Sequence, residues 1–136
     1  HTIIIAGGET PNTDGTGSHA VADVYRLRWD GSQISTDVLP PLPQPTMNAA
    51  GVVVGSSLYV IGGTSSPTAT NTYHTVWSMD LAVPRDEMKW VAHPAWPGPP
   101  RMLAVAANWN GELFLCSGVD LHADTEGKPA RTYLTD

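Results

Sequence analysis

The chain has 136 residues, about the length of one domain. Seven Lys and Arg against thirteen Asp and Glu give a formal net charge of −6, which argues against a nucleic-acid partner. Hydrophobic residues make up 41%, enough for a packed core, but no run approaches the ~18 apolar residues that a membrane-spanning helix needs. Thirteen glycines and twelve prolines predict many turns between short elements.

The first predicted strand, Ile3–Ala6, ends in the glycine pair Gly7-Gly8. The same pattern recurs in 58–63 and, in a degraded form, in 113–118, so that the closing glycines lie 55 residues apart. Self-similarity at a fixed step indicates a repeated structural unit.

The second period shows the unit in full. Its short apolar runs are bounded by turn residues and predict four strands: Ala49–Val54, Leu58–Ile61, Val76–Leu81 and Met88–Ala92. Asn110-Gly111 in the next period is a strong hairpin signal. No segment sustains the apolar spacing of a helix, so helical content is expected to be minor. Four short antiparallel strands per unit are typical of a β-propeller blade.

Three units of unequal completeness follow from this spacing. Residues 1–39 are expected to supply the second, third and fourth strands of one blade, and residues 47–93 a complete blade. Residues 101–136 are expected to supply the first three strands of another, the third being Thr132–Asp136 with Tyr133 in place of Trp77. The prediction is an all-β, incomplete arc of about two and a half four-stranded blades. Its expected partners are the remaining blades, and a ring of several copies is the alternative.

These residues resemble the kelch superfamily, through segments 58–63 and 76–81, Trp90 and the proline-rich approach to Arg101. Within that superfamily, segments 96–101 and 131–136 resemble the bacterial N-acetylneuraminate epimerase (sialic acid mutarotase) group. The resemblance implies a kelch-type β-propeller that isomerises a small-molecule sugar without cofactor or metal. It also implies export to the periplasm.

The resemblance further implies that certain loops gather at one mouth of the propeller channel. On this chain they are Glu9–Ala22, Pro40–Asn48, Thr64–Thr75, Pro94–Leu103 and Val119–Arg131. Arg101 takes a position where kelch blades often direct an arginine into the channel, whereas the matching residue one blade earlier is Thr46.

Interconversion of sugar anomers opens and recloses a hemiketal, which needs one group to donate a proton and one to accept it. Glu9, His19 and His74 lie in the mouth loops and are the candidate catalytic residues. Each of them also fits a solvated loop residue.

A sugar acid needs a cation for its carboxylate, and arginine suits it through its two-pronged guanidinium. Arg101 and Arg131 are the candidates, and Trp96 is the one tryptophan expected to contact a ligand. The alternatives are that Arg101 fastens adjacent blades through backbone carbonyls or an acid, and that Arg131 is solvated.

The other aromatic and sulfur-bearing side chains are expected to be structural. Trp77 and Trp90 lie in predicted strands and are assigned to the core between blades, and Trp109 to packing at the far rim. Cys116 replaces an apolar strand residue and is expected to be buried and inert.

Two further functions compete with the isomerase. A kelch module that binds a glycan or peptide without catalysis rests on the fold alone. A galactose-oxidase-like copper enzyme is disfavoured, because Cys116 lies in a strand and not in a mouth loop. Asp120 and His122 are spaced as two metal ligands, but no others cluster near them, and no metal site is predicted.

Overall fold

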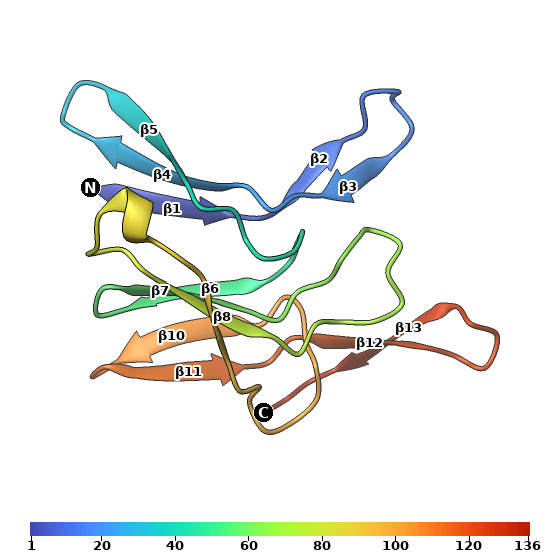
Figure 1. Cartoon of the computed structure of the whole chain (residues 1–136). Coiled ribbons are helices and arrows are strands. Elements are labelled where there is room, and N and C mark those ends of the chain that lie inside the picture. Colours follow the sequence, from blue (N-terminus) through green and yellow to red (C-terminus); the bar gives the residue numbers. More distant parts are fainter.

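The computed structural model describes residues 1–136 and is built almost entirely of β-strands (Figure 1). Antiparallel sheets of three, four and two strands follow one another along the chain, and two separate hairpins accompany them. The helical content is the single 3-10 turn Arg85–Glu87, and no helix has the length and apolar character to cross a membrane. The prediction of an all-β chain of repeated sheets is confirmed.

The first blade is a three-stranded sheet in the order β1-β4-β5. Its strands are β1 (Thr2–Ala6), β4 (Val24–Trp29) and β5 (Ile34–Leu39). The carboxylate of Asp30 closes the β4–β5 turn by accepting hydrogen bonds from the backbone N–H groups of Gln33 and Ser32. Those bonds, first that of Gln33, lower the pKa of Asp30.

The second blade contains four strands in the order β6-β7-β8-β9. They are β6 (Ala50–Val54), β7 (Ser57–Ile61), β8 (Val76–Asp80) and β9 (Val91–His93). The fourth strand begins later than the predicted Met88, because the 3-10 turn at 85–87 directs Met88 into the core, where it is buried.

The third blade has two strands, β10 (Val105–Trp109) and β11 (Glu112–Cys116), joined by a two-residue turn. Both turn residues are left-handed, with φ of 53° at Asn110 and 84° at Gly111. This is the tight hairpin that the Asn-Gly pair predicts.

Two segments predicted as loops fold into hairpins. The hairpin of β2 (Glu9–Pro11) and β3 (Ser18–Ala20) follows the first glycine pair, and β12 (Val119–Ala123) pairs with β13 (Pro129–Tyr133) after Gly118.

The prediction that Thr132–Asp136 is the third strand of the last blade is wrong. The backbone N–H of Gly62 donates to the carbonyl of Thr75, and that of Ser117 donates in the same way to Asp136. Asp136 therefore matches Thr75, which immediately precedes β8, and Tyr133 is no counterpart of Trp77. The cause is length: 17 residues separate Gly118 from Asp136, against 11 between Gly63 and Thr75.

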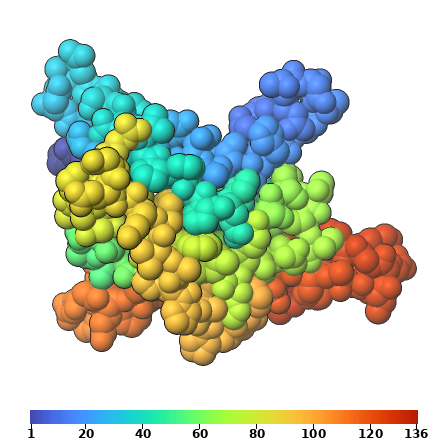
Figure 2. All heavy atoms as spheres, viewed as in Figure 1, coloured from blue at the N-terminus to red at the C-terminus, as the bar shows by residue number.

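A hydrophobic core joins the first and second blades, which pack directly on each other (Figure 2). Its seven buried members are Val24, Leu39, Leu42, Leu58, Val60, Met79 and Met88. Trp90 packs on this core, and its Nε1 donates to the carbonyl of Pro40 at 3.0 Å. The assignment of Trp90 to the core between blades is confirmed. Trp77 is half-buried.

The repeated glycine pair fastens each blade to the next, in a contact we call the glycine latch. The backbone N–H of Gly8 donates to Thr46 at 2.8 Å, and that of Gly63 donates to Arg101 at 2.9 Å. A Cβ atom on Gly62 would lie 2.2 Å from the Arg101 carbonyl oxygen, and φ there is +65°. Only glycine tolerates both the backbone conformation and this close approach.

Candidate functional site

Three polar segments extend toward the same side of the molecule (Figure 1). They are the β2–β3 hairpin, the loop 64–75 between β7 and β8, and the β12–β13 hairpin, which together we call the loop face. The Thr72 hydroxyl donates to the Asp120 carboxylate at 2.9 Å, which connects the middle loop to β12. This hydrogen bond joins side chains of the second and third repeats.

Arg101 is held inside the protein with 2% of its surface exposed. Its two terminal nitrogens grip the Asp136 carboxylate, with Nη1 2.9 Å from Oδ1 and Nη2 2.8 Å from Oδ2. Nη1 also donates to the Ser117 carbonyl at 3.0 Å. These are the contacts expected if Arg101 fastens structure through an acid and a backbone carbonyl.

Asp136 is the exposed partner in this pair, with 59% of its side chain accessible. The hydrogen bonds from Arg101 lower the pKa of Asp136 and so keep it ionised. A charged arginine that is almost completely buried needs such a partner.

Trp96 and His74 complete a cluster around Arg101. The guanidinium carbon lies 5.8 Å from the centre of the Trp96 ring, within reach of a cation–π interaction. The His74 ring meets Trp96 edge-on, with 4.5 Å between ring centres, and its Nε2 donates to the Trp96 carbonyl at 3.0 Å. Three of the six predicted site residues thus lie together.

The other three predicted residues lie on the two hairpins. The Glu9 carboxylate accepts a hydrogen bond from the Ser18 hydroxyl, and the His19 Nδ1 lies 2.6 Å from the Asn12 side-chain oxygen. Both contacts stay within the first hairpin. Arg131 is exposed on β13, opposite Leu121, and forms no ion pair.

A cleft of about 250 Å³ opens beside the Arg101 cluster, between the second and third blades. Apolar side chains of both blades line it, among them Ile61, Val76, Leu113 and Leu115. Leu113 and Leu115 lie 55 residues after Leu58 and Val60, which belong to the core of the first interface. The cleft thus lies at the position that corresponds to part of the first core, where Met79 is completely buried.

Cys116 is exposed, so the prediction that it is buried is wrong. Leu113 and Leu115 turn toward the second blade, and alternation along β11 directs Cys116 to the opposite face with Phe114, itself 46% exposed. Trp109, expected to pack at the rim, is 66% exposed, and its ring centre lies 6.4 Å from that of Phe114.

The side chains that could bind a metal ion lie apart from one another. Asp120 is bound to Thr72, and no three His, Cys, Asp or Glu side chains gather where they could hold an ion.

Sequence reasoning missed Asp136 as the partner of Arg101. A signal was present, because Thr46 and Thr75 of one blade are replaced by Arg101 and Asp136 in the next. Asp136 follows Thr75 by more than the 55-residue step, because the hairpin after Gly118 is longer than the loop after Gly63. A search at constant spacing therefore does not align the two residues.

Comparison with known proteins places this geometry among the kelch propellers. The kelch motif matches residues 45–82. No curated protein matches the chain significantly. A solved structure described as "Structure of YjhT" is 18% identical with a TM-score of 0.62, covering 85% of this chain and 34% of its own. The chain thus spans about a third of that structure's length. Its fold is that of a kelch-type β-propeller, of which it forms an incomplete arc.

Proposed function

We propose that the loop face is part of the active site of a carbohydrate isomerase similar to N-acetylneuraminate epimerase, which interconverts sugar anomers without a cofactor. The observation that carries the proposal is the cluster of His74, Trp96 and Arg101, drawn from two mouth segments. The resemblance of segments 96–101 and 131–136 to the epimerase group supports the substrate class.

His74 is the proposed proton-transfer residue. Its Nε2 is occupied by the Trp96 carbonyl, which fixes the ring and leaves Nδ1 to take the proton of the anomeric hydroxyl. The same imidazole can return a proton after the ring has opened and the carbonyl has rotated. Glu9 and His19, on the neighbouring hairpin, are the candidates for protonating the ring oxygen.

The substrate carboxylate is assigned to Arg131 and not to Arg101. Both terminal nitrogens of Arg101 already bind the Asp136 carboxylate, whereas Arg131 is exposed and has no acidic partner. Arg101 is then a positioning residue, which holds Trp96 and Asp136 in place.

The test is anomer interconversion followed by NMR on the protein with all of its blades. His74→Gln is expected to lower kcat about 100-fold, the usual contribution of one acid–base group. Arg131→Gln is expected to raise KM about tenfold or more, because it removes a charge-assisted contact. Arg28→Gln, in the first blade, is the matched control. Unchanged kcat in His74→Gln would remove His74 from the mechanism.

A binding module without catalysis is the second candidate, and the charge of the loop face favours it. Segments 9–22, 64–75 and 119–131 together contain five acidic residues and two basic ones. Such a balance suits a neutral or cationic ligand better than a sugar acid. Calorimetry with neutral glycans and with N-acetylneuraminate distinguishes the two: binding of the neutral sugars alone, with no isomerisation, would support the module.

A further inference from the structure

The loop 64–75 carries one side chain that reaches into the third repeat. Thr72 is 6% exposed, and its hydroxyl donates to the Asp120 carboxylate at 2.9 Å. Asp120 lies near the start of β12 and is half-buried. A hydrogen bond that is shielded from water holds its two partners more firmly than one on the open surface. The contact therefore fixes the position of the loop relative to β12.

The repeated design of the blades does not require this contact. At the 55-residue step, Asp120 corresponds to Ser65 and Thr72 corresponds to Gly17, which has no side chain to donate. No hydrogen bond joins the β2–β3 hairpin to the loop 64–75. The bond between Thr72 and Asp120 is thus specific to the second interface.

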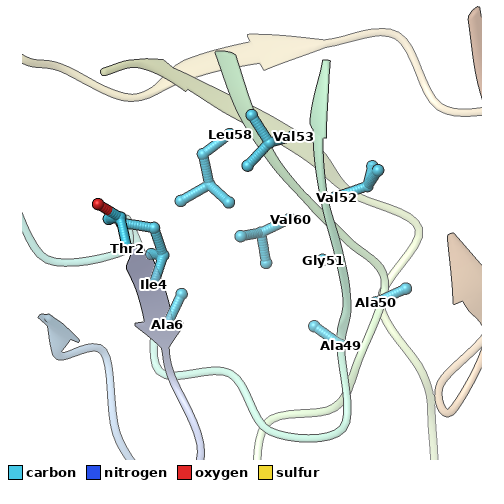
Figure 3. Close-up of a pocket in the computed structure, with 10 residues that line it drawn as sticks. All are labelled: Thr2, Ile4, Ala6, Ala49, Ala50, Gly51, Val52, Val53, Leu58 and Val60. Carbon is cyan, nitrogen blue, oxygen red and sulfur yellow. The ribbon is translucent and has the colours of Figure 1, made fainter. Parts of the chain in front are cut away.

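The first interface shows how two blades meet without such a bond. Ile4 of β1 faces Leu58 and Val60 of β7 across a groove of about 370 Å³ that is lined mostly by apolar side chains (Figure 3). Apolar contacts have no preferred direction, so they bring blades together without fixing the orientation of a loop. A hydrogen bond is directional, and the one between Thr72 and Asp120 supplies that orientation at the second interface.

His74 depends on this orientation because its own hydrogen bond leads toward the third blade. The backbone N–H of Tyr73 donates to the Gly63 carbonyl at 2.8 Å, which holds this part of the loop to the second blade. The Nε2 of His74 donates to the Trp96 carbonyl at 3.0 Å, in the segment that leads into the third blade. The orientation of the imidazole therefore depends on how the loop sits relative to the third blade.

We propose that Asp120 is a positioning residue, which holds the His74 imidazole in its catalytic orientation through the Thr72 hydroxyl. The inference rests on the proposed function, since it takes His74 as the proton-transfer residue. Because Asp120 acts through Thr72 and not on the substrate, its removal should slow the chemical step and leave substrate binding almost unchanged.

The experiment compares two variants of Thr72 in the protein with all of its blades. Thr72→Val removes the donor at similar volume, whereas Thr72→Ser retains a hydroxyl. Thr72→Val is expected to lower kcat about tenfold or more and to change KM less than about twofold, because a displaced proton-transfer group slows the reaction of bound substrate. Thr72→Ser should retain most of the kcat. Thr68→Val, in an exposed part of the same loop, is the matched control.

Double variants separate positioning from a general loss of stability. In a His74→Gln background, Thr72→Val should cause no further loss of kcat, since Thr72 acts through His74. Asp120→Ala should reproduce the effect of Thr72→Val, and the two changes together should be no worse than either one. A further tenfold loss of kcat in the His74→Gln background would overturn the proposal.

Proton NMR of the His74 and Trp96 rings gives a readout that does not need activity. Their ring centres lie 4.5 Å apart, so the nuclear Overhauser effect between their ring protons reports the orientation of the imidazole. The signal should weaken in Thr72→Val and in Asp120→Ala but not in Thr72→Ser. If the unmodified protein shows no isomerisation, the proposed function fails, and this signal still decides whether Asp120 positions His74. An unchanged signal in both variants would overturn the inference even if kcat falls.

Discussion

The two interfaces between blades share one backbone design and differ in their side chains. Each has a glycine latch, from Gly8 to Thr46 at the first interface and from Gly63 to Arg101 at the second. The first contains a core of seven buried apolar residues, whereas Leu113 and Leu115, which take the positions of Leu58 and Val60 at the second, line a cleft. At the second interface, Arg101 and its ion pair lie beside an open cleft.

The comparison shows that the repeat conserves the backbone contacts between blades but not the side chains beside them. Backbone hydrogen bonds and glycine conformations recur because they set the distance between neighbouring blades. Side chains at equivalent positions vary, since either apolar packing or an ion pair can occupy the space beside the latch.

The latch should be the most sensitive feature at both interfaces. Gly62→Ala places a Cβ 2.2 Å from the Arg101 carbonyl oxygen, and Gly7→Ala places one at the same distance from Thr46. Each is expected to lower the free energy of unfolding by about 3 kcal/mol or more, measured by urea denaturation. Gly55→Ala is the control: its φ is +60° but its Cβ would meet nothing within 4 Å, so a loss of only about 1 kcal/mol is expected. Equal losses at all three sites would contradict the latch.

The equivalent leucines Leu58 and Leu113 should show how differently the two interfaces are packed at this position. Leu58 is 5% exposed in the first core, whereas Leu113 is half-buried beside the cleft. Leu58→Ala is expected to cost about 3 kcal/mol and Leu113→Ala about 1 kcal/mol, by the same denaturation experiment. A larger loss at Leu113 would show that the second interface is the better packed.

Replacing Arg101 should weaken the second interface alone. Arg101→Met keeps much of the buried volume but removes three hydrogen bonds, and a loss of about 2 kcal/mol is expected. Arg101→Lys retains the charge without the two-pronged geometry and should recover only part of that loss. Full recovery with lysine would mean that the charge, and not the fork, holds Asp136.

The smallest expected effect is a dependence on acidity. The pKa of Asp136 is lowered in the folded protein, chiefly by its hydrogen bonds from Arg101. A lowered pKa stabilises the fold above the unfolded value near 3.9, and this contribution disappears as the pH falls through the folded pKa. Asp136→Asn should therefore lower the free energy of unfolding at pH 7. Below about pH 4, the free energies of unfolding of the variant and of the unmodified chain should become more similar. A difference that is constant with pH would exclude an ionised Asp136.

The sequence predicted features that rest on local chemistry. The glycine pairs, the Asn110-Gly111 turn and the strands of the second blade follow from turn preferences and apolar patterns, and the structure contains them. The errors arose where the chain departs from strict repetition. The hairpin after Gly118 is longer than the equivalent loop after Gly63, so Tyr133 does not take the position of Trp77.

The candidate site was predictable only in part. Loop position identified His74, Trp96 and Arg101, which do lie together. Sequence spacing could not reveal that Arg101 forms an ion pair with Asp136, because the position of Asp136 depends on the length of the β12–β13 hairpin.

Hydrogen exchange at the three closing glycines tests the repeated latch most directly. Gly8 and Gly63 donate to the segment that leads into the next blade, whereas Gly118, at the equivalent position, donates no backbone hydrogen bond. The latch predicts slow exchange at Gly8 and Gly63 and faster exchange at Gly118, measured by NMR on one sample. Exchange at Gly8 and Gly63 as fast as at Gly118 would contradict it, and with it the arrangement of these sheets as consecutive blades.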